Sequence, residues 1–359
     1  MDGKTFLLMA GGTGGHIFPA LAVAQSLRKR GHHVIWLGSE DAMETRIVPQ
    51  YDIHLETLAI KGVRGNGLKR KLMLPFTLWK TVQAALKMIK QHRIDAVIGF
   101  GGFVTFPGGI AAKLAGIPLI IHEQNAIAGL SNKVLSHLAN QILCAFPQVF
   151  TQQKGQWVGN PVRADIAALP EPSVRFANRE GALRLRVLGG SLGADALNQI
   201  LPEALALLPE NERPQVLHQT GRGRLSGVEA RYHSVGVEAL CVEFVDDMAA
   251  LYRDADILLC RAGALTIAEL TVAGAGALLV PFPFAVDDHQ TANARYLAQA
   301  GAGLLLPQAQ LTAQKLAQVL GGLTREQCLQ WAIQARTLAQ PDSADKVAEI
   351  AVETVAKYD

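Results

Sequence analysis

The stretch FLLMAGGTGGH, residues 6–16, indicates the fold class of this chain. Its first five residues are continuously apolar, as in a strand that is covered on both faces of a parallel sheet. Four glycines, a threonine and a histidine follow, and residues 19–30 then show helical spacing of apolar side chains. A strand, a glycine-rich turn and a helix in this order form the opening unit of a doubly wound α/β sheet.

The same alternation of apolar runs and helical patterns continues to the end of the chain. Each run is short enough for a strand, and the helical patterns lie between the runs. We therefore predict an α/β protein with doubly wound parallel sheets. The expected strands lie within residues 6–10, 33–38, 95–100, 118–123, 141–146, 185–190, 215–221, 240–245, 256–261, 277–283 and 303–307.

A second opening unit predicts a second sheet domain. LRVLGGSLGAD, residues 185–195, repeats the order of strand, glycines, hydroxyl residue, glycine and helix. Residues 159–181 are rich in proline and polar side chains, which is typical of a linker. Pro341 ends the preceding helical pattern, and a last helix is expected at about residues 343–357.

Composition places the chain among ordinary globular proteins. Its 359 residues are 49% hydrophobic and 18% charged, and no apolar run approaches the roughly 18 residues of a membrane span. The start has no pattern of a signal peptide. The four cysteines are widely spaced and form no CxxC pair, so we expect buried free thiols in a reducing cytosol: Cys144, Cys241, Cys260 and Cys328.

Charge is distributed unevenly between the two halves. Residues 1–163 carry 18 Lys and Arg against 8 Asp and Glu, whereas the remainder carries 16 against 23. Nine basic and no acidic residues lie between Lys61 and Arg93, where LKRKLMLPFTLWK (68–80) mixes them with large apolar side chains. This mixture favours docking on an anionic membrane surface; the alternative is a core helix with a solvated basic face. Nucleic acid is disfavoured because aromatic residues are sparse and the other half is acidic. The expected docking residues are Lys69, Arg70, Lys71, Leu72, Phe76 and Trp79.

The loops GGTGGH (11–16) and GGSLGA (189–194) are candidate anion-binding loops. Glycines let backbone N–H groups approach a ligand, and the following helix N-terminus adds positive potential. The alternative is a tight turn with glycines for packing. Neither loop matches the pattern of a P-loop nucleotidase, while Glu40 and Asp41 after the second strand leave a dinucleotide enzyme open.

Two stretches of the second half add polar groups for a nucleotide sugar. In CRAGALTIAEL (260–270) a strand leads into a helix, and Glu269 suits a ribose diol. In the stretch after Val280, DDHQ (287–290) offers groups for sugar hydroxyls. The alternatives are a solvated helix face for Glu269 and a helix-capping pair for Asp287 and Asp288. We expect one domain to hold a nucleotide diphosphate and the other to hold the acceptor.

Seven motifs occur together in this order: GGTGGHIFPALAVA, GFGG with PGG, IHEQNAIAGLSNK, VGNPVR, GGSLGA, RAGALTIAEL and DDHQTANA. The set covers nearly the whole chain and resembles the MurG family, the N-acetylglucosamine transferases of bacterial peptidoglycan synthesis. The resemblance implies the GT-B fold, in which two Rossmann-like domains face a central cleft. It implies an N-terminal acceptor and membrane-docking domain over residues 1–163, to which residues 342–359 return, and a UDP-N-acetylglucosamine domain over residues 164–341.

The resemblance also assigns site residues by position. Phe103 and Phe106 depart from the usual GGYVSGPGG pattern, which bears on contacts with the acceptor. The implied substrate-binding residues are Thr13, Gly14, Gly15, Asn125, Arg163, Ser191, Val245, Ala264, Leu265, Thr266, Ile267, Ala268, Glu269 and Gln290.

The reaction implied by the resemblance is attack of the muramyl 4-hydroxyl of lipid I on UDP-N-acetylglucosamine, with inversion. The enzyme would act as a peripheral protein on the cytoplasmic face of the inner membrane. His16 is the candidate base, held neutral at a helix start, and Glu123 is its rival. We expect no cofactor and no metal, because Asp254-Ala-Asp256 precedes a strand and reads as a helix end plus a strand entry. Competing hypotheses are transfer to diacylglycerol, a non-catalytic nucleotide-sugar binding protein, and an NAD-dependent oxidoreductase.

Overall fold

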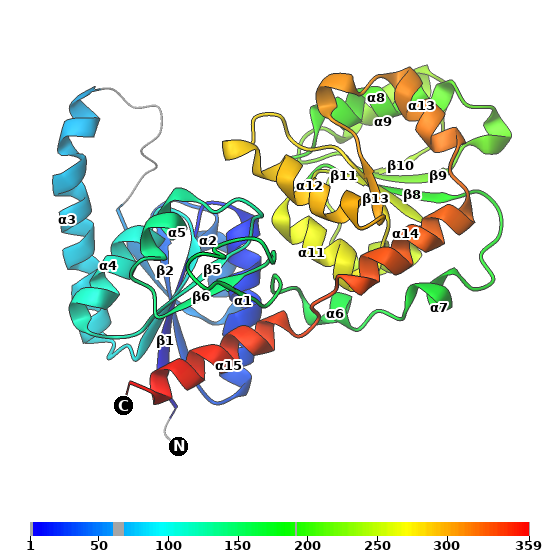
Figure 1. Ribbon diagram of the computed structural model, residues 1–359. Helices are drawn as coiled ribbons and strands as arrows, with labels where there is room; N and C mark the ends of the chain where they lie inside the picture. The colour runs from blue at the N-terminus through cyan, green and yellow to red at the C-terminus, as the bar shows by residue number, and fades with distance from the viewer. Residues whose placement is uncertain (1–2, 60–67, 191, 359) are drawn as a thin grey trace. The chain divides into compact units, whose positions relative to one another are not determined.

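The computed structural model describes residues 3–59, 68–190 and 192–358, without the side chains of residues 68–75. The chain divides into two compact units. Unit 1 comprises Met1–Arg163 and Pro341–Asp359, and unit 2 comprises Ala164–Gln340. Each unit is a parallel α/β sheet with helices on its faces (Figure 1).

Unit 1 contains a seven-stranded sheet in the order β3-β2-β1-β4-β5-β6-β7. Every neighbouring pair is parallel, and Phe6 of β1 pairs with Val34 on one side and Ala96 on the other. The chain changes direction across the sheet between β1 and β4, where open α/β sheets bind ligands. The strands are β1 (Thr5–Ala10), β2 (His33–Ser39), β3 (His54–Leu58), β4 (Ala96–Gly101), β5 (Leu119–Glu123), β6 (Gln141–Cys144) and β7 (Gln156–Trp157).

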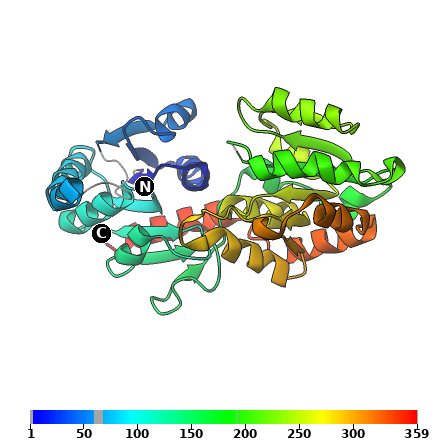
Figure 2. The ribbon, with the colours of Figure 1, turned by 90° about the horizontal axis from the view of Figure 1, so that it is seen from above.

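The helices of unit 1 include the last helix of the chain. That helix, α15, packs on α1 (Figure 1), and Ser26 Oγ donates a hydrogen bond to Asp345 at 2.5 Å. Val347 and Ala351 of α15 join the buried core around Trp36. α3 lies against α4 in both views (Figures 1 and 2). The α-helices are α1 (Gly14–Lys29), α2 (Glu44–Ile47), α3 (Leu68–Gln91), α4 (Thr105–Ala115), α5 (Leu130–Leu135) and α15 (Ser343–Ala356), with the 3-10 helix η1 at Val48–Tyr51.

Unit 2 contains a six-stranded parallel sheet in the order β10-β9-β8-β11-β12-β13, which reverses direction between β8 and β11. Its strands are β8 (Arg184–Leu188), β9 (Gln215–Gln219), β10 (Leu240–Val242), β11 (Ile257–Cys260), β12 (Ala277–Leu279) and β13 (Gly303–Leu305). Its α-helices are α6 (Ala164–Ala167), α7 (Pro172–Phe176), α8 (Asp195–Ala206), α9 (Leu225–Ser234), α10 (Met248–Asp254), α11 (Ala264–Ala273), α12 (His289–Gln299), α13 (Ala313–Gly321) and α14 (Arg325–Thr337). Its 3-10 helices are η2 (Glu210–Glu212), η3 (Val286–Asp288) and η4 (Gln308–Gln310).

The sequence predicted eleven strands, and each predicted run contains one. It missed β3 and β7, which lie at the two edges of the sheet of unit 1. β3 reads HLETL and is half polar, and β7 has two exposed residues, so neither has the continuous apolar run of a buried strand.

Two other expectations need correction. α1 begins at Gly14 instead of Pro19, so the second half of the glycine loop is already the first turn of the helix. Most of the expected linker is not a free connection: it contains α6 and α7, both of which belong to unit 2, and α7 is hydrogen-bonded to the rest of that unit. The Arg175 guanidinium donates to the carbonyl oxygens of Tyr252 at 2.8 Å and Ala273 at 2.7 Å.

The four cysteines are buried and free, as the sequence predicted. Burial raises the pKa of the thiols of Cys144, Cys260 and Cys328 to about 12 and that of Cys241 to about 11. Thiols with such pKa values are protonated and unreactive at neutral pH. Across the described ranges, no helix is both long enough and apolar enough to span a bilayer.

Candidate functional site

Two glycine loops of unit 1 touch at the point where its sheet changes direction. Gly11 follows β1, and Gly102 follows β4 with a φ of +91°. A Cβ on Gly102 would lie 2.7 Å from the carbonyl oxygen of Gly11, so a larger residue would push the loops apart. Thr105 Oγ1 accepts a hydrogen bond from the N–H of Gly101 at 3.1 Å. The loops are therefore held in one arrangement by sterics and by a buried hydroxyl.

Glu44 at the start of α2 anchors the first loop. This side chain is fully buried, and its carboxylate accepts hydrogen bonds from the backbone N–H groups of Gly12 at 3.1 Å and Ser39 at 2.8 Å. Sequence reasoning singled out Glu40 and Asp41 after β2, but both are exposed. The anchoring role of Glu44 could not be predicted from its neighbours in sequence, because it depends on backbone N–H groups from the loop after β1 and the end of β2.

His16 is the third residue of α1 and is half-buried. Its Nδ1 lies 3.1 Å from the carbonyl oxygen of Gly11. A carbonyl oxygen only accepts hydrogen bonds, so in the tautomer that this contact favours Nδ1 carries the proton and Nε2 has the lone pair. A Cβ on Gly101 would lie 3.1 Å from Nε2, so the glycine leaves room on that side of the ring. The arrangement holds one basic nitrogen at the switch point of the sheet.

Glu123 ends β5 and is only 2% exposed. Its carboxylate accepts hydrogen bonds from the N–H groups of Asn125 and Gly129, each at 3.0 Å, and from the Asn132 amide at 2.9 Å. A carboxylate that accepts from several neutral donors organises the turn after β5. This geometry favours a structural role for Glu123.

A buried polar network surrounds the end of β5. Burial lowers the pKa of His122 to about 4, and the neutral ring donates from Nε2 to the carbonyl oxygen of Gly159 at 2.9 Å. Of the six buried side-chain atoms without a hydrogen-bond partner in the described residues, four lie here: Gln124 Oε1, Asn132 Oδ1 and both amide atoms of Asn160. Such groups are places for water or for hydroxyl and amide groups of a ligand. Sequence reasoning missed these residues, although all lie within the motifs IHEQNAIAGLSNK and VGNPVR.

In unit 2 the start of α11 lies at the corresponding switch point, after β11. The first bond within the helix joins the N–H of Ile267 to the carbonyl oxygen of Gly263 at 3.0 Å. The N–H groups of Ala264, Leu265 and Thr266 are left pointing out of the helix start, where the dipole favours an anion. This turn is therefore suited to a diphosphate.

Two predicted residues lie on the elements around this turn. Glu269 of α11 is buried, and Tyr252 donates its hydroxyl proton to Glu269 Oε2 at 2.9 Å. Gln290 Oε1 of α12 accepts a hydrogen bond from the N–H of Phe282 at 2.9 Å. Arg261, directly after β11, donates a hydrogen bond to the carbonyl oxygen of Val280 at 3.1 Å. The loop after β12, to which Gln290 is bonded through Phe282, is therefore also tied to the end of β11.

The remaining predicted residues are placed as follows. Thr13 is the exposed N-cap of α1, followed by Gly14 and Gly15 in its first turn. Asn125 follows β5, and Val245 is half-buried after β10. Arg163, also half-buried, is the last residue of its segment of unit 1, and Ser191 lies outside the described residues.

The Asp-Ala-Asp triplet is a helix end and a strand entry, as expected. Asp254 ends α10 and pairs with Arg184 and Arg186, which hold its pKa below the usual range against the raising effect of burial. Asp256 precedes β11 and pairs with Arg179 and, at 3.3 Å, with Arg325. These carboxylates are therefore occupied by guanidinium groups at the amino end of the sheet.

Comparison with known proteins identifies the family. The N-terminal domain of glycosyltransferase family 28 matches residues 6–144, and its C-terminal domain matches residues 184–349. The UDP-N-acetylglucosamine--N-acetylmuramyl-(pentapeptide) pyrophosphoryl-undecaprenol N-acetylglucosamine transferase of Neisseria meningitidis serogroup A is 70% identical, covering 98% of this chain and 99% of that protein. The protein of the same name from Dechloromonas aromatica is 52% identical, and the match covers 98% of this chain and 99% of that protein.

Solved structures agree. The crystal structure of Acinetobacter baumannii MurG is 41% identical, with a TM-score of 0.86, and covers 98% of this chain and 99% of that chain. The crystal structure of the calicheamicin glycosyltransferase CalG4 is 15% identical, with a TM-score of 0.67, and the match covers 99% of this chain and 100% of that chain. At this identity the likeness shows a common fold.

Proposed function

The chain belongs to glycosyltransferase family 28, and on that premise we propose how its residues perform the transfer. It has two parallel-sheet α/β domains of the GT-B kind and is an enzyme that transfers N-acetylglucosamine from UDP-N-acetylglucosamine to the muramyl pentapeptide on pyrophosphoryl-undecaprenol. This activity serves peptidoglycan synthesis, and it replaces the oxidoreductase and binding-protein hypotheses.

Unit 2 holds the donor. The outward N–H groups at the start of α11 take the diphosphate, and they stabilise the charge that UDP gains as it leaves. Glu269 accepts hydrogen bonds from the ribose hydroxyls, while Gln290 contacts the sugar. The support is the position of α11 beside the switch between β8 and β11. The carboxylates of Asp254 and Asp256 are engaged by arginines, so the Asp-Ala-Asp triplet has no part in binding a donor metal.

Unit 1 holds the acceptor, and His16 is the base. The muramyl 4-hydroxyl gives its proton to Nε2 as its oxygen bonds to the anomeric carbon of the donor. The bond from that carbon to the diphosphate oxygen breaks on the opposite face, and its electron pair leaves with UDP, which inverts the centre. The observation that carries this proposal is the contact of Nδ1 with the Gly11 carbonyl oxygen, which leaves Nε2 free to accept the proton.

The polar network after β5 extends the acceptor site. The unpartnered buried atoms of Gln124, Asn132 and Asn160 match the hydroxyl and amide groups of a muramyl peptide better than they match an apolar ligand. Phe103, which is 47% exposed in the loop after β4, lies on the same carboxyl side of the sheet.

α3 docks unit 1 on the membrane that carries the acceptor. Phe76 and Trp79 are 57% and 56% exposed, and Lys80 Nζ lies 4.5 Å from the centroid of the Phe76 ring. Val82 and Ala85 are buried on the inner side of the helix; Phe76, nine residues before Ala85, lies on the opposite side, and Trp79 is exposed at the flank. Exposed aromatic residues among lysines favour an anionic bilayer over a solvated face. The side chains of Lys69, Arg70, Lys71 and Leu72 lie outside the described residues.

A second exposed strip lies on and just after α5 and extends the proposed surface. Leu130 and Val134 are 68% and 42% exposed, and Lys133 and His137 are exposed beside them. Docking through both helices would hold the enzyme peripherally, on the cytoplasmic face from which the nucleotide sugar is supplied.

The test is product analysis. Purified enzyme receives labelled UDP-N-acetylglucosamine with either a lipid I analogue or diacylglycerol. We expect a β-linked disaccharide on the lipid I analogue and no transfer to diacylglycerol. Transfer to diacylglycerol alone would refute the proposed acceptor. Wild-type rates in His16→Ala would refute the proposed base while leaving the activity intact.

A further inference from the structure

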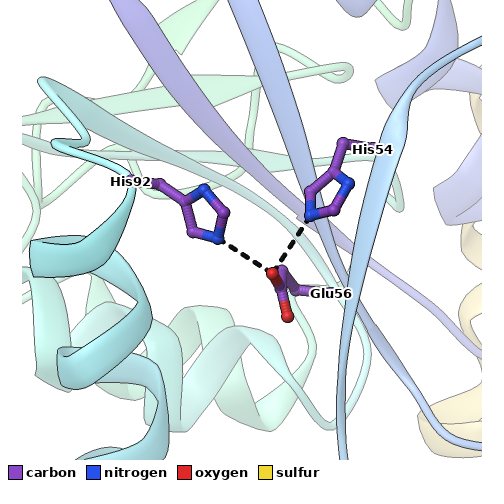
Figure 3. Close-up of side chains that lie close together, drawn as sticks. All are labelled: His54, Glu56 and His92. Carbon is purple, nitrogen blue, oxygen red and sulfur yellow. Dashed lines mark hydrogen bonds and ion pairs between the residues drawn. The ribbon is translucent and has the colours of Figure 1, made fainter.

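Three side chains that the transfer reaction does not use converge at the edge of unit 1. Nε2 of His54 lies 3.0 Å from Oε1 of Glu56, and Nε2 of His92 lies 2.8 Å from the same oxygen (Figure 3). The candidate ligand atoms all lie within 4.8 Å of one another. Two imidazoles and one carboxylate facing a common point are a donor set that suits zinc.

The three side chains come from rigid elements. His54 and Glu56 are two residues apart on β3, so they lie on one face of a strand that β2 holds in register through Leu37. His92 follows α3 directly, and its N–H donates to the Met88 carbonyl oxygen at 3.0 Å.

The end of α3 is also fixed beyond His92. Arg93 takes a left-handed φ of +50°, and the N–H of Ile94 reaches back to the carbonyl oxygen of Ile89 at 3.0 Å. This bond closes the helix end as in a Schellman motif. The site is therefore assembled before any ion arrives, which favours binding.

We propose that His54, Glu56 and His92 bind a divalent zinc ion. Zinc bonds of about 2.0–2.1 Å in a tetrahedral site place neighbouring ligand atoms about 3.3 Å apart. The two distances between the imidazoles and Glu56 are 2.8 and 3.0 Å, so each of these pairs needs to open by only a few tenths of an ångström, and the two imidazole nitrogens lie within 4.8 Å of each other. The side chains are 60%, 35% and 21% exposed, which gives the ion a path in and leaves a fourth position for water.

The ion would join β3 to the carboxyl end of α3. These two elements are neighbours in sequence but are separated by residues 59–67, and α3 packs chiefly on α4. Bound zinc would therefore add a direct link between the edge of the sheet and the helix that carries Phe76 and Trp79. Binding itself is independent of the transfer reaction, whereas this consequence for docking rests on the proposed function of α3.

The test uses the full chain without a polyhistidine tag, after treatment with chelator and removal of the chelator. Zinc is titrated by calorimetry, and bound metal is counted by mass spectrometry after gel filtration. We expect one zinc per chain for the wild type and at least a hundredfold weaker binding for the His54→Gln/His92→Gln double variant. The matched control is His33→Gln/His233→Gln, which changes two other exposed histidines and should bind like the wild type. Magnesium, which prefers oxygen ligands, should not compete.

A second measurement separates ligation from misfolding. Cobalt should give a visible absorption band in the wild type and in the control, and Glu56→Gln should weaken that band. Transfer activity should be the same in all these variants, so a failure of the zinc proposal is distinguishable from a failure of the transferase proposal. No zinc on the wild type, equal zinc on the double variant, or saturation only at a large excess of zinc would each refute the site.

Discussion

The imidazole Nδ1 of His16 lies 3.1 Å from the carbonyl oxygen of Gly11. This contact joins the first turn of α1 to the end of β1, and it determines which ring nitrogen carries the proton. The same helix start that makes the loop rigid thus presents a base with its lone pair on Nε2. Gly101 has no Cβ, which would lie 3.1 Å from Nε2, so no side chain at that position obstructs this nitrogen.

Replacing His16 with Ala should lower kcat by about 10²–10⁴-fold, the usual contribution of a general base. KM for UDP-N-acetylglucosamine should change less than kcat, because a general base acts in the chemical step and the donor contacts proposed for Glu269 and Gln290 lie in unit 2. Steady-state kinetics with a lipid I analogue measures both values. Gly101→Ala is the companion variant, since its Cβ would lie 3.1 Å from Nε2 at a φ of +107°. It should also reduce kcat, whereas a loss of donor affinity alone in either variant would contradict the assignment.

Glu269→Ala should raise KM for UDP-N-acetylglucosamine by about 10–100-fold, the range for a lost hydrogen bond to a charged group. Turnover should fall less, because a ribose contact is made equally in the ground and transition states. The matched control is Tyr252→Phe, which removes the 2.9 Å hydrogen bond to Glu269 and leaves the carboxylate in place. Equal effects of the two variants would mean that Glu269 acts by holding Tyr252 and not by binding ribose.

Transfer should continue in excess EDTA at close to its normal rate. The N–H groups at the start of α11 and the Arg163 guanidinium are expected to neutralise the leaving diphosphate. Initial rates with and without chelator check this point. Loss of activity that magnesium restores would require a catalytic metal site.

Membrane binding should depend on α3. Changing Lys69, Arg70 and Lys71 to Glu removes three attractions of about 1 kcal/mol each, which is over a hundredfold in partition, and adds repulsion. Trp79→Ser should weaken binding further. Sedimentation with anionic vesicles at several salt concentrations measures the effect, and UDP affinity should stay unchanged.

The control for this experiment reverses three exposed charges of unit 2, Arg222, Arg231 and Lys315. It should sediment like the wild type. If the α3 variant does so too, the strip with Lys133 and His137 becomes the candidate docking surface.

Stability should fall as the pH drops from about 6.5 towards 4. Burial lowers the pKa of His122 and His218 to about 4, so the unfolded chain takes up protons in this window and the folded chain does not. Each histidine contributes about 3 kcal/mol to the free energy of unfolding above the window, and this contribution is lost through it. Urea denaturation at several pH values should show that the free energy of unfolding falls less steeply with decreasing pH in His218→Gln than in the wild type. The exposed His233→Gln should not alter the decline.

Much of the fold was readable from the sequence because the signals are local. A continuous apolar run such as Phe6–Ala10 is a buried strand wherever it lies, and glycines at its end mark a tight turn into a helix. The fold class, eleven strands, the buried cysteines and the helix-end nature of Asp254 followed from such patterns. Motifs in a fixed order then identified the family.

The tertiary structure decided which polar side chains serve the site. Glu44 and Glu123 are similar carboxylates in sequence, yet both are occupied by backbone N–H groups, those on Glu44 coming from the loop after β1 and the end of β2 and those on Glu123 from its own turn. β3 has no apolar run, so its existence and the meeting of His54 with His92 depend on pairing with β2 and on where α3 ends. Hydrophobic periodicity is a property of neighbouring residues. Hydrogen-bond partners and ligand sets come from segments far apart in the chain, and only the folded backbone brings those segments together.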